Sequence, residues 1–330
     1  MDLKIGPSLA LFAGLIMPLG VAAQPALNTN ATIVYYDSSG NATLDPAEPQ
    51  NGSSYSHETL LALYETVIRF DQDGKLTPGL AQSWEMAPDL TELTLHIRTG
   101  ATFHDGAKVN AEAIKRNFER NAALGRRAGN VVADTARLIK TIDVLDENTL
   151  KLTLTEPSGQ IELRLAYNSG MMVSPASFAP TASGEPPFGS TLKGVGAGPY
   201  QLKSFDANTK TVMTRFGGYW AGTAGRPAGF EHHYVPESRA RFNAVQSGQA
   251  TIALIEPRQI AEAKAQGLKI LIAEKNALWD IYLNVSRPVL KDVRVRRALM
   301  HATDREALAD AMGFGKIGRA SCRERVCLAV

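Results

Sequence analysis

Residues 230–273 read FEHHYVPESRARFNAVQSGQATIALIEPRQIAEAKAQGLKILIA, and they carry the clearest signal of the fold class. Its apolar periodicity switches repeatedly between the patterns of strands and helices. The predicted segments, in the order strand, helix, strand, helix, strand, are 230–235, 237–247, 251–255, 257–266 and 268–273. Gly248 and Gly267 end the two helices, and Pro257 suits the first turn of the second. A β-α-β-α-β order predicts parallel strands with right-handed crossovers, and therefore an α/β fold.

The chain before this stretch alternates short strands with helices. Thr32–Tyr36 is rich in β-formers and ends in the turn Asp37–Gly40. Apolar residues at helical spacing predict a helix over Ser56–Phe70. Asn110 is placed to cap another helix. Further strands are predicted at 93–97, 141–145 and 149–154, the last two as a hairpin, and residues 173–198 are expected to be a domain crossover.

After residue 273, the predicted elements are a strand from Trp279 to Val285 and a helix from Asp292 to His301. Thr303–Glu306 matches a capping box for one more helix.

Composition indicates a folded protein without a disulfide framework. The chain has 330 residues, 44% of them hydrophobic and 21% charged. Its two cysteines, Cys322 and Cys327, both lie close to the end. The net charge of +2 also arises there, since residues 316–330 hold four basic residues and one acidic residue. The remainder is slightly acidic, so composition does not favour binding to nucleic acid.

The first residues have the layout of a secretory signal peptide. Lys4 precedes an apolar run from Leu9 to Leu19, and the small residues Val21–Ala23 follow. Cleavage is predicted after Ala23, which makes residues 1–23 the signal peptide. No cysteine follows the cleavage position, so no lipid anchor is indicated and the mature protein is expected in the periplasm.

Three groups of polar residues are candidates for functional sites. His104–Asp105 lies in a tight turn and favours a structural role over catalysis. His232–His233 would point to opposite faces of a strand, so we expect surface histidines and no metal site. The basic cluster Arg294, Arg296 and Arg297 favours a solvated helix face over an anion or partner contact. Neither a Gly-x-Ser-x-Gly motif nor a phosphate-binding loop is present.

A series of collinear motifs resembles the family 5 solute-binding proteins, the dipeptide, oligopeptide and nickel class. Each motif is weak alone, but their order over residues 33–312 is specific. The motifs include Leu63–Phe70, Gly74–Ala81, Phe103–Gly106, Gly196–Tyr200, Tyr219–Trp220, Ala244–Gly248 and Asp292–Leu299.

The resemblance implies an α/β periplasmic-binding-protein-like fold of two lobes with an inserted extra subdomain. Residues 27–55 and 191–276 would build the main sheet of the first lobe, and residues 56–190 would be the inserted subdomain. Residues 277–315 would only begin the second lobe, which would be mostly missing. Such lobes close over a ligand held between them.

The same resemblance supplies candidate ligand-binding residues. The edge of the first lobe would present Tyr36, Asp37 and Ser38 to the backbone of an extended peptide. Gly170 and Met171, in the loop Ser169–Val173, are the second candidates, and Trp279 is the third. For the strand edge and for the loop, structural roles in a strand end and a core-packing loop are equally compatible with the sequence, and Trp279 could equally belong to the core.

The implied function is that of the substrate-binding component of an ABC importer, a monomer that captures peptides and delivers them to the membrane permease subunits. No cofactor, metal or enzymatic activity is expected. A nickel-complex or other small-solute binding protein is the alternative within the family, and an enzyme or adhesin on the same scaffold is the alternative outside it.

Residues 316–330 are expected to be a non-native tail. Both cysteines and an abrupt positive charge occur there, and Ile317–Val326 resembles translated adaptor sequence. A divergent but genuine C-terminal tail is the alternative.

The signal peptide gives the first testable prediction. N-terminal sequencing of the protein from the periplasmic fraction should begin at Gln24. A product that starts at Met1 and stays with the membrane would contradict the prediction.

Overall fold

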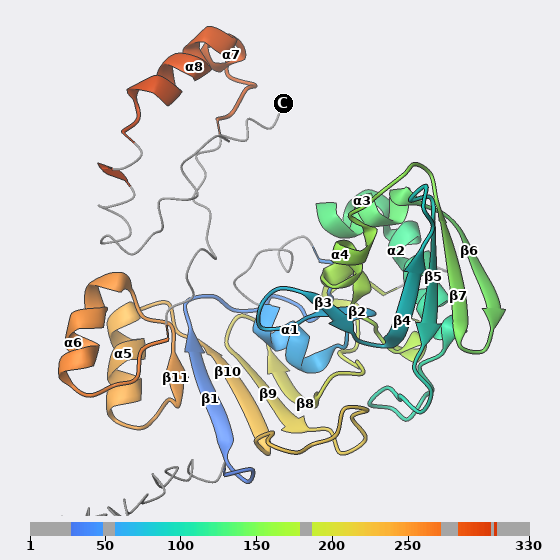
Figure 1. Cartoon of the computed structure of the whole chain (residues 1–330). Coiled ribbons are helices and arrows are strands. Elements are labelled where there is room, and N and C mark those ends of the chain that lie inside the picture. Colours follow the sequence, from blue (N-terminus) through green and yellow to red (C-terminus); the bar gives the residue numbers. More distant parts are fainter. Residues whose placement is uncertain (1–27, 49–56, 179–186, 272–282, 305–306, 309–330) are drawn as a thin grey trace, which may run out of the picture.

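The strand β1 (Thr32–Asp37) lies inside a five-stranded sheet between partners that come from the far end of the chain (Figure 1). In the computed structural model, which describes residues 28–48, 57–178, 187–271, 283–304 and 307–308, β1 pairs in parallel with β10 (Gly229–Tyr234) and with β11 (Ile252–Ala253). The predicted parallel pairing is therefore confirmed for these strands. The sheet is part of a mixed α/β fold.

The rest of this sheet differs from the prediction in two respects. An antiparallel hairpin, β8 (Tyr200–Asp206) and β9 (Lys210–Arg215), extends it to the order β11-β1-β10-β9-β8, so the sheet is mixed. Residues 268–271 form no strand, and 272–273 lie outside the described residues. The predicted third parallel strand is thus not found in the described part of 268–273.

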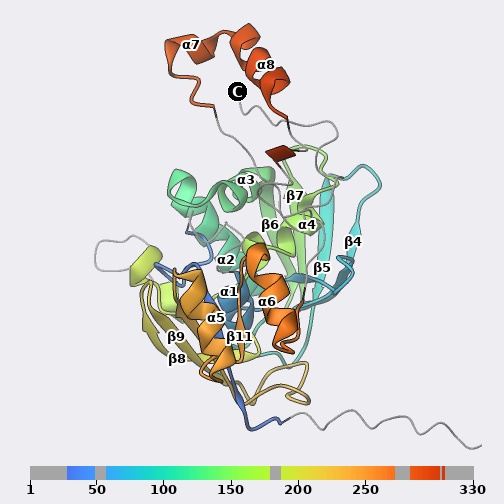
Figure 2. The same cartoon turned by 90° about the vertical axis from the view of Figure 1, so that its left-hand side faces the viewer.

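The helices after β10 are capped as the sequence predicts. The helix α5 (Ser238–Gln246) is followed by Gly248 at φ +76°, a left-handed conformation that favours glycine. Pro257 opens a short 3-10 turn (Pro257–Gln259) that leads into α6 (Ile260–Ala265), and Gly267 at φ +73° follows. Both helices lie on the β11 side of the sheet (Figures 1 and 2).

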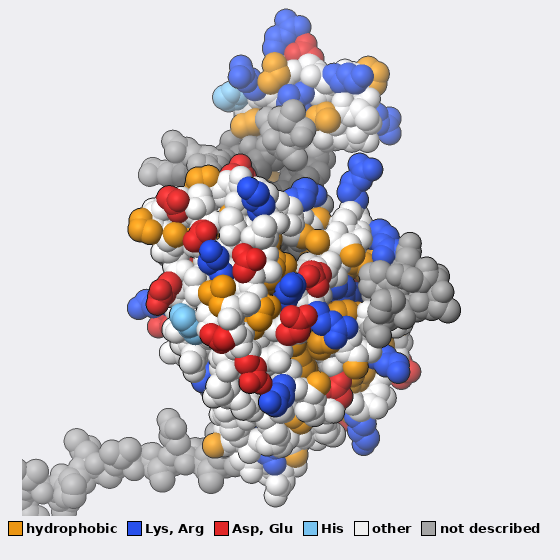
Figure 3. Space-filling view, turned by 90° about the vertical axis from the view of Figure 1, so that its right-hand side faces the viewer, with side chains coloured by type: hydrophobic (Ala, Val, Ile, Leu, Met, Phe, Trp, Pro, Cys, Tyr) orange, Lys and Arg blue, Asp and Glu red, His pale blue; other side chains and the backbone are white. Residues whose placement is uncertain are grey.

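A second body, built from residues between β1 and β8, contains an antiparallel sheet of order β4-β5-β7-β6. Its strands are β4 (Ala81–Met86), β5 (Glu92–Ile97), β6 (Ile139–Asp146) and β7 (Thr149–Leu154). The predicted hairpin of β6 and β7 is confirmed. Leu93 and Leu95 point to a core shared with Ile114 and Phe118 of α2, whereas the outer side carries interspersed charges of both signs (Figure 3).

The helices of this second body cover one side of its sheet. The helix α2 (Ala111–Leu124) begins where Asn110 accepts a hydrogen bond from the backbone N–H of Ala113, as predicted. The other helical segments are a 3-10 turn at Gly125–Arg127, α3 (Asn130–Leu138), α4 (Ile161–Leu165), and 3-10 turns at Asn168–Gly170, Pro175–Phe178 and Gly189–Thr191.

The prediction of one long helix over 56–70 is correct only as far as residue 63. The helix α1 spans only His57–Leu63, and the chain then forms the strand β2 (Ile68–Phe70), paired with β3 (Leu76–Pro78). The backbone N–H of Val67 donates to the carbonyl of Gly170, and the carbonyl of Thr66 accepts from Leu80. Tertiary pairing of this backbone outweighs the helical periodicity of its side chains.

Close backbone contacts join the two bodies at α1. A buried ion pair between Arg120 and Asp45 is a second link. A Cβ on Gly196 would lie 2.1 Å from the carbonyl oxygen of Leu63, so only glycine fits there. Arg120 of α2 is 2.6 Å from Asp45, and both side chains are at most 2% exposed. Removing one partner of such a pair leaves a buried charge unpaired, which costs about 3–5 kcal/mol. This pair therefore ties the segment after β1 to the second body.

The last described elements have no core of their own. They are α7 (Pro288–Lys291) and α8 (Val293–Ala302), and neither contains a buried residue. The Asp292 side chain caps α8 as predicted. Val289 is 64% exposed and Leu299 is 44% exposed. The predicted strand 279–285 lies largely outside the described residues, as does half of the capping box at 303–306. Among the described helices, none is long and apolar enough to cross a membrane.

These exposures give a prediction about the stability of the chain. Deleting everything after Leu271 should leave the midpoint of thermal unfolding within about 2 °C of that of the mature chain, because no side chain of α7 or α8 is buried. Aggregation, measured by light scattering at the same concentration, should fall because exposed apolar surface is removed. A midpoint lowered by more than about 5 °C would show that these residues support the fold.

Candidate functional site

The carboxyl ends of β1, β10 and β11 meet at one edge of the first sheet. The register places Tyr36 beside His233 on one side and beside Ala253 on the other. Ligands of open α/β sheets bind outside the carboxyl ends of parallel strands. This edge is therefore the first place where a ligand site is expected, and it includes the sequence-predicted residues Tyr36, Asp37 and Ser38.

Asp37 is the most buried of these residues, at 2% exposure. One carboxylate oxygen accepts a hydrogen bond from the backbone N–H of Ser38 at 2.6 Å. The other lies 3.4 Å from Nε2 of His232, which is equally buried. These contacts fix the Asp37 carboxylate in one orientation at the end of β1.

Glu58, in the first turn of α1, brings a second carboxylate to the same place. Tyr35, Asp37, Ser38, Glu58 and His232 are called the strand-end cluster below. Burial, followed by the charges of Asp37 and Glu58, raises the pKa of Tyr35 well above its usual range. Desolvation by the surrounding protein is the main cause that raises the pKa of the Glu58 carboxyl, and the charge of Asp37 adds to it. A hydrogen bond from the backbone N–H of Glu58 and the charge of His232 act in the opposite direction. The cluster therefore couples two acids, a histidine and a tyrosine across β1, α1 and β10.

Tyr36 is separated from this cluster because successive side chains of a strand alternate between faces. Its ring stacks on His233 at 4.9 Å, whereas the ring of Tyr35 lies 5.5 Å from His232. The two histidines therefore do point to opposite faces. The expectation that both are surface residues is wrong for His232, which pairing with Asp37 allows to be buried.

The second predicted group lies inside the protein. Gly170 and Met171 are buried, and Met171 belongs to the core that α1 shares with the first sheet. A Cβ on Gly170 would lie 1.8 Å from the carbonyl oxygen of Leu165, so the glycine permits a close approach within the chain. This burial favours the core-packing interpretation of the loop. Trp279, the third candidate, lies outside the described residues.

The turn at His104–Asp105 is held by hydrogen bonds and by a ring contact, since the His104 ring lies 4.8 Å from that of Phe216. Nδ1 of His104 accepts from the backbone N–H of Gly196 at 3.3 Å, and Nε2 lies 3.0 Å from the carbonyl of Gly198. This pairing fits the neutral ring with its hydrogen on Nε2. Burial lowers the pKa of His104, against smaller opposing effects of Gly198 and Asp105. Asp105 accepts from the hydroxyl of Ser174 at 2.5 Å. These contacts support the predicted structural role.

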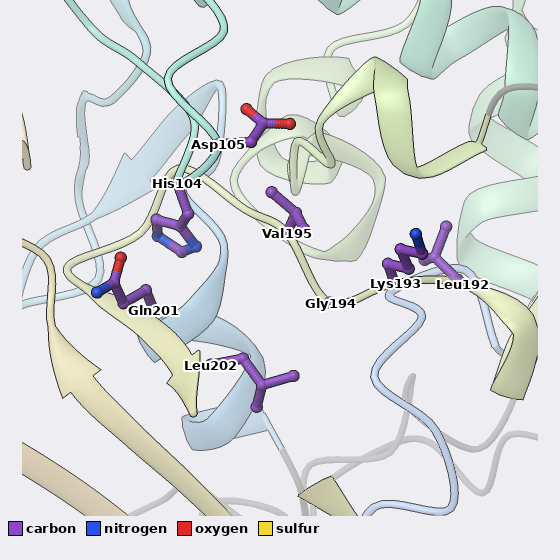
Figure 4. A pocket seen from close by; sticks show the side chains of 8 residues that line it. All are labelled: His104, Asp105, Leu192, Lys193, Gly194, Val195, Gln201 and Leu202. Carbon is purple, nitrogen blue, oxygen red and sulfur yellow. The ribbon is translucent and has the colours of Figure 1, made fainter. Parts of the chain in front are cut away.

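An open cavity of about 460 Å³ lies beside this turn, at the β8 edge of the first sheet (Figure 4). It is lined by His104, Asp105, Leu192, Lys193, Gly194, Val195, Gln201 and Leu202. None of these belongs to the strand-end cluster, so the two places are separate. His104 and Asp105 already use their hydrogen-bonding groups within the chain, which makes the cavity the weaker candidate.

The basic cluster also makes its contacts within the chain. In the basic cluster of α8, Arg294 pairs with Asp292 at 2.7 Å, and Arg296 donates to the carbonyls of Leu290 and Lys291. Within the described residues, no group of three or more His, Cys, Asp or Glu side chains is placed to hold a metal ion.

Sequence reasoning missed Glu58 and the aromatic contacts next to it. The ring of His57 stacks on that of Tyr167 at 4.1 Å, and burial, followed by the charge of Glu58, raises the pKa of Tyr167. Residues 57, 58 and 167 share no motif or spacing in the sequence. The only signal that could have pointed to Glu58 is an acidic side chain in the first turn of a predicted helix.

Comparison with known proteins finds relatives that are named for binding glutathione and dipeptides. The chain is 26% identical over 270 residues to the glutathione-binding protein GsiB of Pectobacterium atrosepticum, which covers 81% of this chain and 50% of that protein. It is 26% identical over 315 residues to the dipeptide-binding protein of Escherichia coli, covering 89% and 58%. The crystal structure of Haemophilus influenzae OppA in complex with RPPGFSPFR superposes with a TM-score of 0.74 at 20% identity, covering 88% and 59%.

The chain thus spans little more than half the length of the curated relatives that it matches. A model of the bacterial extracellular solute-binding proteins, family 5 middle region, matches residues 75–321 and so extends into the segment 316–330. The fold is that of the periplasmic binding proteins of this type. Because the family match covers most of the sequence, the chain belongs to the family 5 bacterial extracellular solute-binding proteins.

Proposed function

We propose that this protein captures peptides outside the cytoplasm and delivers them to the permease subunits of an ABC importer. The observation that carries the proposal is the family match over residues 75–321, together with relatives named for glutathione and dipeptide binding. The protein acts as a monomer in the periplasm, without a lipid anchor, a cofactor or an enzymatic activity of its own.

The peptide lies against the strand ends of the first lobe. Residues 27–55 and 191–276 form the main part of this lobe, residues 56–190 are the inserted subdomain, and residues 277–315 begin the second lobe. Support comes from the meeting of three parallel strand ends at Asp37 and from the exposed apolar side chains of α7 and α8, which a second lobe would cover.

Within the strand-end cluster, the Asp37 and Glu58 carboxylates suit a ligand with a positively charged group, because a charge-assisted hydrogen bond to a carboxylate is stronger than a neutral one. The Ser38 segment supplies backbone groups for an extended peptide. Tyr36 and Trp279 remain proposed contacts, and Gly170 and Met171 are proposed to support the wall from within.

We predict that a version of the chain with the length of its relatives binds a dipeptide and that the 330-residue chain does not. A version carried to the length of its relatives should gain about 2–3 °C in unfolding midpoint with a dipeptide at 100 times its Kd, because a ligand that binds only the native state stabilises it by about 2.7 kcal/mol and a chain of that length has a large entropy of unfolding. The 330-residue chain should show no shift and no micromolar calorimetric binding, since a cleft needs both of its walls to bury a ligand.

Other ligands and activities separate this proposal from its alternatives. Stabilisation by nickel complexes alone, or by sugars alone, would sink the peptide proposal. Release of free amino acids during incubation with peptides would identify an enzyme on this scaffold.

We further propose that residues 316–330 are not native sequence. The clustering of both cysteines and of the basic charge supports this proposal, whereas the family match, which reaches residue 321, argues against a boundary as early as residue 316.

Resequencing the locus past the codon for Gly315 tests the proposed tail. An open frame that continues into second-lobe sequence is expected. A stop codon after Val330 in clean genomic DNA would overturn the proposal that residues 316–330 are non-native. It would also overturn the proposal that second-lobe sequence continues beyond them.

A further inference from the structure

Arg241 is a buried cation whose hydrogen bonds all go to the backbone at the strand ends. It lies on α5 and is 2% exposed. Its Nε donates to the carbonyl of Leu254 at 2.6 Å, and Nη1 donates to the carbonyls of Val235 and Pro236, both at 2.7 Å. These carbonyls follow directly after β10 and β11, so one guanidinium joins the ends of two strands that are not neighbours in the sheet.

The same residues connect Arg241 to β1, the strand between them. The backbone N–H of Val235 donates to the carbonyl of Asp37 at 2.8 Å, and the N–H of Leu254 donates to the carbonyl of Tyr36 at 3.0 Å. Val235 and Leu254 therefore donate to the end of β1 and accept from Arg241 through their own carbonyls. All three strand ends are linked through a single side chain.

The geometry of the guanidinium explains why arginine occupies this position. Its donors diverge in a fixed plane, which lets one rigid group reach carbonyls from two separate loops. A lysine ammonium carries the same charge on a flexible stem with its donors at one point, so it cannot hold both loops in the same way. The charge also reaches the strand-end cluster: burial and then Asp37 raise the pKa of Tyr35, and the charge of Arg241 opposes part of this rise.

We propose that Arg241 is the positioning residue of the solute site: it fixes the ends of β1, β10 and β11 as one unit, so that Asp37 and Ser38 are presented to the ligand in a preorganised conformation. The proposal rests on the proposed function for its ligand, but the mechanical link through Val235 and Leu254 concerns this chain alone. Preorganisation of this kind lowers the cost of ordering the site when the ligand binds.

The mechanical link is tested by amide hydrogen exchange in the mature chain. In Arg241→Lys, exchange at the amides of Val235 and Leu254 should be about tenfold faster or more, because the loops lose charge-assisted hydrogen bonds. Arg241→Gln, which buries no ammonium group, is measured in parallel, and each variant that keeps the wild-type circular dichroism is scored. Wild-type exchange rates at both amides in a folded variant would overturn the proposal.

Arg120→Lys is the matched control. Arg120 is also buried, and it donates to Asp45 and to the carbonyl of Pro187, away from the strand ends. Its substitution should lower the unfolding midpoint as much as Arg241→Lys or more, yet leave exchange at Val235 and Leu254 at the wild-type rate. Equal acceleration in both variants would mean that general destabilisation is responsible and would overturn the proposal.

The functional readout is the Kd for a dipeptide, measured on the chain extended to the length of its relatives. At 20 °C, well below the unfolding midpoints, Arg241→Lys should raise the Kd for a dipeptide about tenfold through faster dissociation, while Arg120→Lys leaves it unchanged. An unchanged Kd in Arg241→Lys would overturn the positioning role. Failure of the wild type to bind any peptide would instead remove the proposed function, and the exchange result would still decide the link between the strand ends.

Discussion

The strand β1 is inserted between β10 and β11, and the arrangement of both bodies follows from this insertion. Asp37 and His232 are 195 positions apart in sequence, and parallel pairing brings them to 3.4 Å. Such pairing can form only after a long loop is closed, and that closure costs conformational entropy. The second body occupies this loop, and a loop whose interior is folded leaves fewer free residues to close. The site at the strand ends is therefore a product of the whole chain from Thr32 to Ala253.

The junction between the bodies explains why the second body can fill the loop without disturbing the strand ends. It meets the first sheet at α1, where Gly196 lies against the backbone of Leu63 and Tyr64 donates to the carbonyl of Leu44 at 2.7 Å. Another buried carboxylate, Glu65, accepts hydrogen bonds from Tyr219 and Trp220 on the return path. Three motifs that resemble those of the family thus supply contacts at this junction, namely Leu63–Phe70, Gly196–Tyr200 and Tyr219–Trp220.

Helices and strands were predicted correctly where neighbouring residues in the sequence determine the local structure. The Asn110 and Asp292 caps, the hairpin of β6 and β7 and the parallel strands β10 and β11 follow from capping, turn chemistry and periodicity. The helix over 56–70 failed because the backbone near Val67 pairs with distant residues. Burial of His232 and the position of Glu58 depend on partners from other elements, and no spacing in the sequence encodes those. Of the candidate site, the segment Tyr36–Ser38 could be predicted only through the family resemblance.

Amide hydrogen exchange can show whether the ligand lies against the end of β1. It is measured on the chain extended to the length of its relatives, with and without a saturating dipeptide. The account predicts slower exchange in a peptide covering residues 36–39 and little change in the buried loop at residues 168–173, because that loop already serves the core. Protection of residues 168–173 without any change at 36–39 would contradict it and place the ligand elsewhere.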